Sequence, residues 1–254
     1  MKIYKNIHEA YLETLRDVYF NYEYRSSPRG MPVREKTDYT FRILEPAAES
    51  IKTKDEARNK TIESYTAKET ELYDSCSDRV EDFAKASKFW ENIANPDGTI
   101  NSAYGYLIWK KRSHGNPAYE SGTGRPCKEN SHTMRTPWEW AKESLLQDKD
   151  SRQALLRFSL PSHQWVGNKD QTCTLSGLFL IRENKLNLSI VMRSNDLWLG
   201  LTYDLPWFIS LIDKMVADLK DKYPDLTKGH YTHTVHSLHL YERDEDKIKR
   251  ALGI

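Results

Sequence analysis

This chain of 254 residues has few cysteines, no long apolar run and almost no net charge. Its cysteines, Cys76, Cys127 and Cys173, form no CxxC pair, so the sequence indicates neither a disulfide framework nor a zinc site, and a reducing compartment is expected. No run approaches the about 18 apolar residues of a membrane helix, and residues 1–6 lack the apolar core of a signal peptide. We therefore expect a cytosolic protein without membrane contact.

The charge balance excludes another class of partner. The chain has 38 basic and 37 acidic residues and a formal charge of +1, which argues against a surface that coats nucleic acid. No nucleic acid is required as a partner, and any phosphate must be bound by a few local side chains. The length can bury one substantial core, so we expect a single domain over residues 1–254.

Apolar periodicity predicts several helices and loops. Residues 7–22 predict an opening amphipathic helix with a buried stripe at Ile7, Ala10, Tyr11, Thr14, Leu15, Val18 and Tyr19. Residues 138–146 predict a helix, and residues 205–219 predict the buried central one. The polar stretch 45–60 is interpreted as a solvated loop. Glycines and prolines in 114–137 predict a long loop that either shapes a cofactor mouth or only decorates the surface.

A predicted β-hairpin carries the most informative cysteine. Residues 173–181 and 186–192 alternate apolar side chains around a tight turn at 183–185. Cys173, at the start of one strand, should therefore lie beside Arg193, which follows the other. Such a guanidinium would lower the thiol pKa and hold a phosphate. A cysteine on its own is more often a small buried hydrophobe, so its neighbours decide the interpretation.

Downstream and upstream motifs resemble those of one family. After Cys173 come Arg193-Ser194-Asn195-Asp196, Gly200, Asp204 and His239-Leu240-Tyr241, which resemble the thymidylate synthase superfamily in order and spacing and are most similar to its phage deoxycytidylate hydroxymethylase branch. The Asn-x-x-Tyr-Gly segment at 101–105, the Asp-Ser-Arg motif at 150–152, the loop 27–30 and the segment 68–73 extend the resemblance over most of the chain.

The resemblance implies an α/β (α+β) fold, with a large mixed sheet flanked by helices and sheets packed at a homodimer interface. It implies that Arg29, Arg193 and Ser194 bind the phosphate of a pyrimidine nucleotide, and that Arg152 reaches across from the second subunit. The family has a second arginine where this chain has Gln153, which places that corner of the phosphate site in question.

The resemblance also implies the chemistry. The co-substrate would be 5,10-methylenetetrahydrofolate, with Asp196 and Gly200 beside it and no metal. Cys173 would add to C6 of the pyrimidine, which makes C5 nucleophilic. Glu69 would organise water and act as general acid or base, with Tyr104 in the same catalytic set. Glu71, two residues further on, is the alternative to Glu69.

The base is expected to be cytosine because of Asp204. Thymidylate synthases have Asn at this position, which both donates and accepts, whereas an ionised Asp only accepts. A carboxylate therefore complements the 4-amino group and a protonated N3 of cytosine and repels O4 of uracil. The same Asp204 could also cap a helix that begins at Leu205. His239 and Tyr241 share one strand face, and the resemblance assigns them to the 3′-hydroxyl.

Three further histidines, His230, His233 and His236, have a spacing that suggests a metal site. However, their alternation with Tyr, Thr and Val predicts a strand that turns His233 to the opposite face from the other two. A shared metal ion is therefore not expected.

The resemblance thus implies a deoxycytidylate 5-hydroxymethyltransferase that serves synthesis of modified DNA, located in the host cytoplasm if a phage encodes it. Thr174, where synthases usually have His, points the same way. The sequence ends at residues 250–254 without the synthases' Pro-Val tail, which favours water over hydride as the final reactant. A CMP hydroxymethylase, an enzyme that methylates dUMP or dCMP, and a nucleotide- or RNA-binding regulator on the same fold stay open.

Overall fold

A computed structural model describes residues 1–112 and 135–254. The loop predicted over 114–137 lies outside the described residues except for its last three positions, which lead into and begin a helix at Pro137. No helix within the described ranges combines the length and the apolar character needed to cross a bilayer.

The described residues form a large mixed sheet, as the sequence predicts. Its main path runs β1-β3-β8-β6-β5-β4, with β2 paired to β3 and β7 paired to β8. The pairs β1–β3, β6–β8 and β7–β8 are parallel and the others are antiparallel. The strands are β1 Lys2–Tyr4, β2 Tyr24–Ser26, β3 Val33–Ile43, β4 Leu155–Arg157, β5 Thr174–Arg182, β6 Lys185–Met192, β7 Asn195–Asp196 and β8 Thr227–Tyr241.

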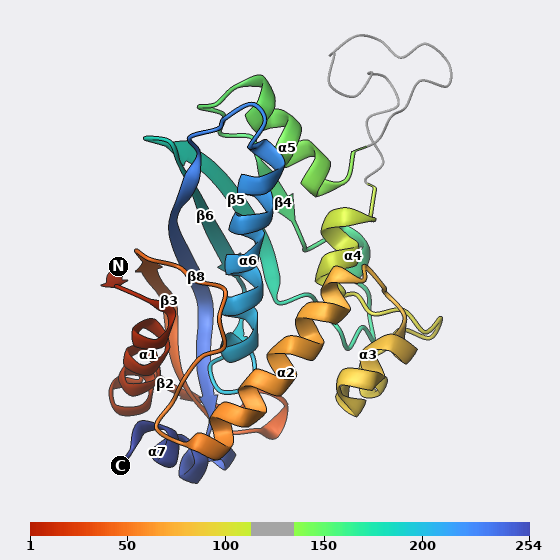
Figure 1. Ribbon diagram of the computed structural model, residues 1–254. Coiled ribbons are helices and arrows are strands. Elements are labelled where there is room, and N and C mark those ends of the chain that lie inside the picture. The colour runs from red at the N-terminus through yellow and green to blue at the C-terminus, as the bar shows by residue number, and fades with distance from the viewer. Residues whose placement is uncertain (113–134) are drawn as a thin grey trace.

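Helices pack on the sheet around one long central helix. The helices are α1 Ile7–Asn21, α2 Glu56–Asp74, α3 Val80–Ala86, α4 Tyr104–Trp109, α5 Pro137–Gln147, α6 Leu201–Leu219 and α7 Glu245–Leu252. Figure 1 shows α6 crossing the face of the sheet with α2 beside it, and α6 contacts β6, β8 and α2. The site described below lies where α2, α6 and the ends of β5, β6 and β8 meet.

The first helix confirms its prediction. Asn6 caps α1 by accepting a hydrogen bond from the backbone of Glu9, and the predicted apolar stripe is the buried face of the helix. Residues 137–147 also form the helix expected there, and Thr136 and Glu139 make a capping box at its start.

The prediction of a solvated loop over residues 45–60 is wrong in its second half. Asp55 caps α2 by accepting from the backbone of Ala57 and Arg58, so the helix begins at Glu56. Arg58 and Asn59 are buried, and the guanidinium of Arg58 donates to the Tyr203 hydroxyl at 3.0 Å. The start of α2 could not be predicted because a helix is recognised in a sequence by the spacing of its apolar side chains. The buried residues in this turn, Arg58 and Asn59, are polar.

The predicted hairpin is confirmed. Glu183 and Asn184 both have left-handed φ angles, 52° and 57°, as a tight two-residue hairpin turn requires. The pairing of β5 with β6 runs from this turn to Thr174 opposite Met192. Just beyond that pair, the backbone N–H of Arg193 donates to the carbonyl of Cys173 at 2.8 Å. The two residues therefore lie side by side.

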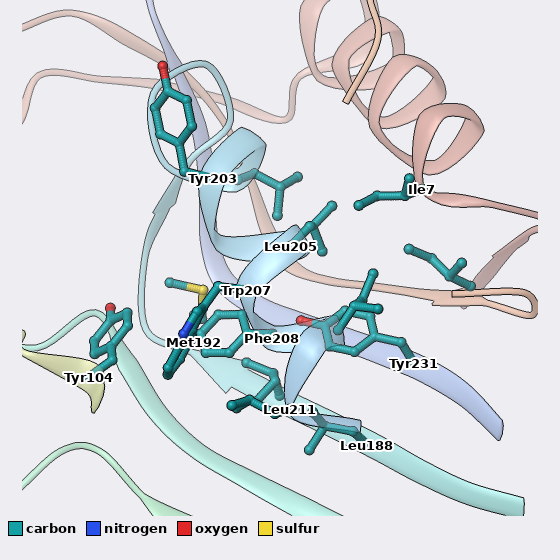
Figure 2. Close-up of a cluster of buried hydrophobic side chains, with 14 of the residues drawn as sticks. Ile7, Tyr104, Leu188, Met192, Tyr203, Leu205, Trp207, Phe208, Leu211 and Tyr231 are labelled. Carbon is teal, nitrogen blue, oxygen red and sulfur yellow. The ribbon is translucent and has the colours of Figure 1, made fainter. Parts of the chain in front are cut away.

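The central helix is buried, as predicted, but it begins four residues earlier, at Leu201. Asp204 consequently lies within its first turn, and the alternative role of Asp204 as the helix cap is wrong because Gly200 occupies the cap position. Figure 2 shows Trp207 and Phe208 of this helix packed near Tyr104 and Met192. Tyr104 stacks on Phe208 with ring centroids 6.0 Å apart.

Strand β8 separates the three histidines as expected. His233 is fully buried and its Nδ1 lies 2.7 Å from the hydroxyl of Tyr231, whereas His236 is exposed and His230 is half-buried. The described ranges contain no group of three or more side chains able to hold a metal ion.

Candidate active site

The thiol of Cys173 lies beside a guanidinium that is fixed in place. Nη2 of Arg193 is 3.5 Å from the Sγ of Cys173. The same guanidinium donates through Nε to the carbonyl of Thr172 at 3.0 Å and through Nη2 to the carbonyl of Gln171. These backbone acceptors carry no charge, so the positive charge of Arg193 remains available to an anion.

The thiol of Cys173 is less acidic than an ordinary cysteine thiol. Burial raises the pKa of Cys173 and is the largest influence on it, Arg193 lowers the pKa, and the negative charge of Asp204 raises it again. The predicted effect of Arg193, which lowers the thiol pKa, is confirmed, but burial has the larger effect and the net pKa is raised. Desolvation of a buried thiolate outweighs one neighbouring cation here.

The carboxyl group of Glu69, which is buried on α2, lies close enough to that of Asp204 on α6 for the two charges to interact. Burial, followed by the charge of Asp204, raises the pKa of Glu69 to about 8, and hydrogen bonds from Tyr65 and Tyr73 oppose the shift. Glu71, on the same helix, is exposed. The geometry therefore places Glu69, and not Glu71, in the interior with Asp204.

Asp204 lies half-buried in the first turn of α6 and is held by one amide. The Nδ2 of Asn195 donates to its Oδ2 at 2.6 Å. The pKa of Asp204 is raised to about 7. Burial is the largest cause of this shift, the hydrogen bond from Asn195 opposes it, and the charge of Asp196 adds to it. Asn195 was not among the site residues predicted from the sequence. Its only sequence signal was its place in the motif between Ser194 and Asp196.

Position 200 has room for glycine only, because neighbouring atoms lie too close for a side chain. A Cβ at this position would lie 2.9 Å from the carbonyl oxygen of Asp196 and 3.3 Å from Oδ2 of Asp204. The first distance is shorter than real Cβ contacts allow, so a side chain would displace the start of α6. The lack of a Cβ at Gly200 thus lets the carboxylate of Asp204 lie close to the backbone of Asp196.

Tyr104 of α4 contacts both α2 and the segment that carries Cys173. Its hydroxyl accepts a hydrogen bond from the backbone N–H of Thr174 at 3.4 Å, and its ring stacks on Tyr73 at 5.3 Å. Burial raises the pKa of Tyr104 well above its ordinary value, and the charges of Asp204 and Cys173 add to this. Its hydroxyl is therefore a neutral hydrogen-bonding group next to both residues.

The end of β8 brings two predicted residues to the same place. The rings of His239 and Tyr241 meet edge to face at 5.3 Å, and Asp196 of β7 pairs with His239 across the strands. Oδ1 of Asp196 accepts from the backbone of Trp198 and Leu199 at 2.8 and 3.1 Å. Burial raises the pKa of Asp196, and His239 opposes that shift.

The other residues predicted to bind phosphate, Arg29, Ser194 and Arg152, occupy different positions. Arg29 is exposed in the 3₁₀ turn Pro28–Gly30, and its charge lowers the pKa of Cys173 and Tyr241, so the turn lies within electrostatic reach of the thiol. Ser194 follows Arg193 directly, just before β7. Arg152 is exposed just before the edge strand β4, and it makes no hydrogen bond or ion pair with any residue that the structure describes. The described residues of one chain do not bring Arg152 to the site.

A comparison with family models identifies the family. The model described as thymidylate synthase matches residues 9–253. The chain belongs to the thymidylate synthase family. Among curated proteins it is 31% identical to the deoxycytidylate 5-hydroxymethyltransferase of Enterobacteria phage T4 over 188 residues, which cover 71% of this chain and 68% of the relative.

A second curated relative and a solved structure are also similar to this chain. The deoxyuridylate hydroxymethyltransferase of Bacillus phage SP01 is 33% identical over 120 residues, covering 44% of this chain and 30% of that protein. The solved structure of thermostable thymidylate synthase A from Bacillus subtilis has a TM-score of 0.68 at 18% identity, over 98% of this chain and 84% of the other, and shows the fold.

Family membership establishes the class of reaction. The thymidylate synthase family uses methylenetetrahydrofolate, and this chain is a folate-dependent enzyme that transfers one carbon to C5 of a pyrimidine. Its relatives are named for both cytosine and uracil nucleotides. Membership of the family therefore does not determine which base the protein binds.

Proposed function

We propose that the protein is a deoxycytidylate 5-hydroxymethyltransferase, which converts dCMP, 5,10-methylenetetrahydrofolate and water to 5-hydroxymethyl-dCMP and tetrahydrofolate. The observation that carries the proposal is the half-buried carboxyl group of Asp204, which accepts a hydrogen bond from Asn195 and is close enough to Cys173 to change its pKa. The similarity to the phage deoxycytidylate enzymes supports the same substrate.

Asp204 would read the base by accepting hydrogen bonds. When ionised it has no hydrogen to donate, so it pairs with the 4-amino group and a protonated N3 of cytosine. The O4 of uracil would face the same carboxylate with a lone pair and would be repelled. A buried mismatch of this kind discriminates strongly, because neither group can turn to water instead.

Cys173 would be the nucleophile that adds to C6 of the base. Addition of sulfur there converts C5 into an enamine-like carbon, which can attack an electrophilic one-carbon unit. Arg193, 3.5 Å from the sulfur, stabilises the thiolate that addition requires and counteracts the effect of burial on its pKa. Loss of the C5 proton and departure of tetrahydrofolate would leave an exocyclic methylene group on the base, to which water adds. Elimination of the thiolate from C6 would then free the hydroxymethyl product.

Glu69 would move protons and hold the water that becomes the new hydroxyl. With a pKa of about 8, it changes charge close to neutral pH, which suits a group that must both donate and accept protons. Tyr104, neutral and hydrogen-bonded to Thr174, would help to orient the reacting base.

The residues near Asp196 fit a folate. One oxygen of this carboxylate holds backbone N–H groups, whereas the other accepts no hydrogen bond from the described residues and is available to an N–H donor of a pterin ring. Leu199, exposed next to it, and Gly200 offer apolar and backbone surface. When bound, methylenetetrahydrofolate supplies the one-carbon unit at C5.

Arg193, Ser194 and Arg29 would bind the 5′-phosphate, because planar guanidinium groups pair with phosphate oxygens. Arg152 would complete this site from the second subunit of a homodimer, which agrees with its exposure and its lack of a partner among the described residues. Gln153 follows it with a neutral side chain. His239 and Tyr241 would hold the 3′-hydroxyl of the sugar.

The test mixes the purified protein with methylenetetrahydrofolate and, in separate reactions, dCMP, CMP or dUMP labelled with tritium at C5. Tritium release from dCMP with a hydroxymethyl product identified by mass supports the proposal, and Cys173→Ser should abolish the release. A methyl product with dihydrofolate contradicts the hydration step. Preference for CMP or dUMP contradicts the assigned substrate, and absence of release from every nucleotide contradicts the proposed activity.

A further inference from the structure

Cys173 lies where an irregular segment of the chain meets a strand. Strand β5 begins one residue later, at Thr174, and residues 164–173 form no helix or strand. On the side of β6, the carbonyl of Cys173 accepts a hydrogen bond from the backbone N–H of Arg193, next to the last β5–β6 pair. The segment before Cys173 has no strand pairing, so side chains have to hold it in place.

A buried carboxylate three residues before Cys173 supplies this anchor, and the proposed function assigns it no role. Asp170 is 4% exposed. Its Oδ2 accepts a hydrogen bond from the backbone N–H of Ser102 at 2.8 Å, and its Oδ1 is hydrogen-bonded to the Ser102 hydroxyl. The carbonyl of Asp170 accepts from Nδ2 of Asn101 at 3.1 Å. Three hydrogen bonds thus join the segment before Cys173 to residues 101–102.

The same short stretch of chain is also bonded to the residue after Cys173. Ser102 lies two residues before Tyr104, the first residue of α4. The Tyr104 hydroxyl accepts from the backbone N–H of Thr174 at 3.4 Å. The charge of Cys173 contributes to the raised pKa of Tyr104, which shows that the two groups lie close together. The nucleophile is therefore enclosed between one bond from Asp170 to Ser102 and another from Thr174 to Tyr104.

We propose that Asp170 is a positioning residue for the nucleophile, because its carboxylate ties the segment of Cys173 to the start of α4 and so holds the thiol beside the Tyr104 hydroxyl. The inference rests on the proposed role of Cys173 and extends it to a residue that does not touch the reacting atoms. Asp170 acts through the two hydrogen bonds to Ser102.

The charge of Asp170 does not assist the nucleophile. Burial is the largest cause of the raised pKa of Cys173, and the negative charge of Asp170 adds to it. A carboxylate at this position therefore makes the thiolate harder to form. Burial also raises the pKa of Asp170 itself, whereas the hydrogen bonds from Ser102 lower it. What Asp170 contributes is therefore the geometry of its hydrogen bonds.

The thiol interacts with several other charged or titratable groups, which a substitution of Asp170 leaves in place. They come from the turn before β3, from α4 and α6, and from the ends of β6 and β8. They are Arg29, Tyr104, Arg193, Asp204 and Tyr241. A change in the titration of Cys173 after a substitution that keeps the shape of Asp170 therefore reports the loss of the Asp170 charge.

Three substitutions separate the hydrogen bonds of Asp170 from its charge. Asp170→Asn removes the charge and keeps both bonds, because the amide oxygen can accept from the Ser102 N–H and the amide nitrogen can donate to the Ser102 hydroxyl. Asp170→Ala removes the charge and both bonds. Ser102→Ala removes one bond and keeps the charge. We would measure kcat by tritium release, and the pH midpoint of Cys173 alkylation by iodoacetamide, with mass spectrometry of the Cys173 peptide.

We expect kcat to follow the hydrogen bonds and the alkylation midpoint to follow the charge. In Asp170→Ala kcat should fall about 100-fold, since a displacement of about 1 Å can have this effect, and in Ser102→Ala it should fall by less. Asp170→Asn should keep most of the native kcat. Its alkylation midpoint should move to lower pH, because a negative charge near the thiolate is gone, whereas Ser102→Ala should leave the midpoint unchanged.

The matched control is Asp17→Ala, which removes another carboxylate that joins separate elements. Asp17 of α1 forms ion pairs with Lys2 of β1 at 2.7 Å and with Lys36 of β3 at 3.1 Å. Strands β8 and β6 separate these two strands from β5. The control should lose stability and keep the native kcat and the native alkylation midpoint of Cys173.

Three results would overturn the inference: a native kcat in Asp170→Ala, an equal loss of kcat in Asp170→Ala and Asp170→Asn, or an alkylation midpoint that Asp170→Asn leaves unchanged. If Asp170→Ala does not fold, Ser102→Ala decides in its place, and a native kcat in that variant would overturn the inference.

A readout without turnover separates this inference from the proposed function. If no nucleotide releases tritium, the proposed reaction fails, and amide hydrogen exchange at Thr174 tests the tie instead. Loss of the bonds between Asp170 and Ser102 should loosen the contact of Tyr104 with Thr174. The Thr174 amide should therefore exchange faster in Asp170→Ala than in Asp170→Asn, and equal rates would overturn the inference.

Discussion

At the scale of single residues, the site contains carboxyl groups whose pKa values are raised by burial. The pKa of Glu69 is raised to about 8 and that of Asp204 to about 7, and each charge raises the pKa of its neighbours. Perturbed values of this kind are typical of catalytic groups, although ion pairs of purely structural function show them too. Here the geometry also places the thiol of Cys173 close to Asp204.

The substitution Asp204→Asn should shift the preference of the enzyme from dCMP toward dUMP. An amide of the same shape both donates and accepts, so it should accommodate the edge of uracil. We expect kcat/KM for dCMP to fall by about two orders of magnitude and kcat/KM for dUMP to rise, since the unpaired buried groups then belong to cytosine. Tritium release with both nucleotides checks this. A variant that retains its preference for dCMP would show that another residue reads the base.

At the scale of elements, the start of α6 positions the carboxylates of the site through a close backbone contact. Gly200→Ala would place a Cβ 2.9 Å from the carbonyl of Asp196. We expect a stability loss of about 1–3 kcal/mol from this overpacking together with at least a tenfold fall in kcat/KM, measured by urea unfolding and tritium release.

The matched control is Gly177→Ala in β5, where a Cβ would lie 2.8 Å from Cδ1 of Ile190. This crowding is similar, but it involves the flexible end of a side chain outside the site. The control should lose stability and retain its KM for dCMP. If both variants lose activity equally, the role assigned to Gly200 is wrong.

Elements with strong apolar periodicity were predictable from the sequence. The opening helix and the β5–β6 hairpin follow their patterns closely, because tertiary packing and local preference agree there. The start of α2 was missed because its buried residues include Arg58 and Asn59, which carry no apolar signal. Asn195 was missed because its partner Asp204 belongs to another element, and a sequence does not show which polar side chains meet.

At the scale of the whole molecule, a complete site requires two chains if Arg152 acts as proposed. Cys173→Ala and Arg152→Ala proteins should each have little activity. Mixing them under conditions of subunit exchange should make half of the dimers mixed, each with one intact site, and restore about one quarter of native activity. Tritium release after mixing checks this, and no recovery would place Arg152 outside the partner's site.

The buried carboxyl groups also predict how stability depends on pH. Because the folded pKa of Glu69 lies above its unfolded value, the folded protein binds more protons between about pH 4.5 and 8, and this group lowers stability as pH rises through that window. Glu69→Gln should therefore gain stability relative to the native protein at pH 8 but not at pH 4.5, by a few kcal/mol. Urea unfolding at both values tests this, and an equal difference at both would contradict it.

The hairpin that carries Cys173 and Arg193 also bears on how the molecule acquires activity during folding. These residues are twenty positions apart and are joined by a tight turn, so little loop entropy opposes their meeting. Glu69 and Asp204 belong to α2 and α6 and meet only through long-range packing. Local contacts form faster than distant ones. A partly folded chain could thus bind an anion at the hairpin before it can transfer protons, and turnover would report completion of the fold.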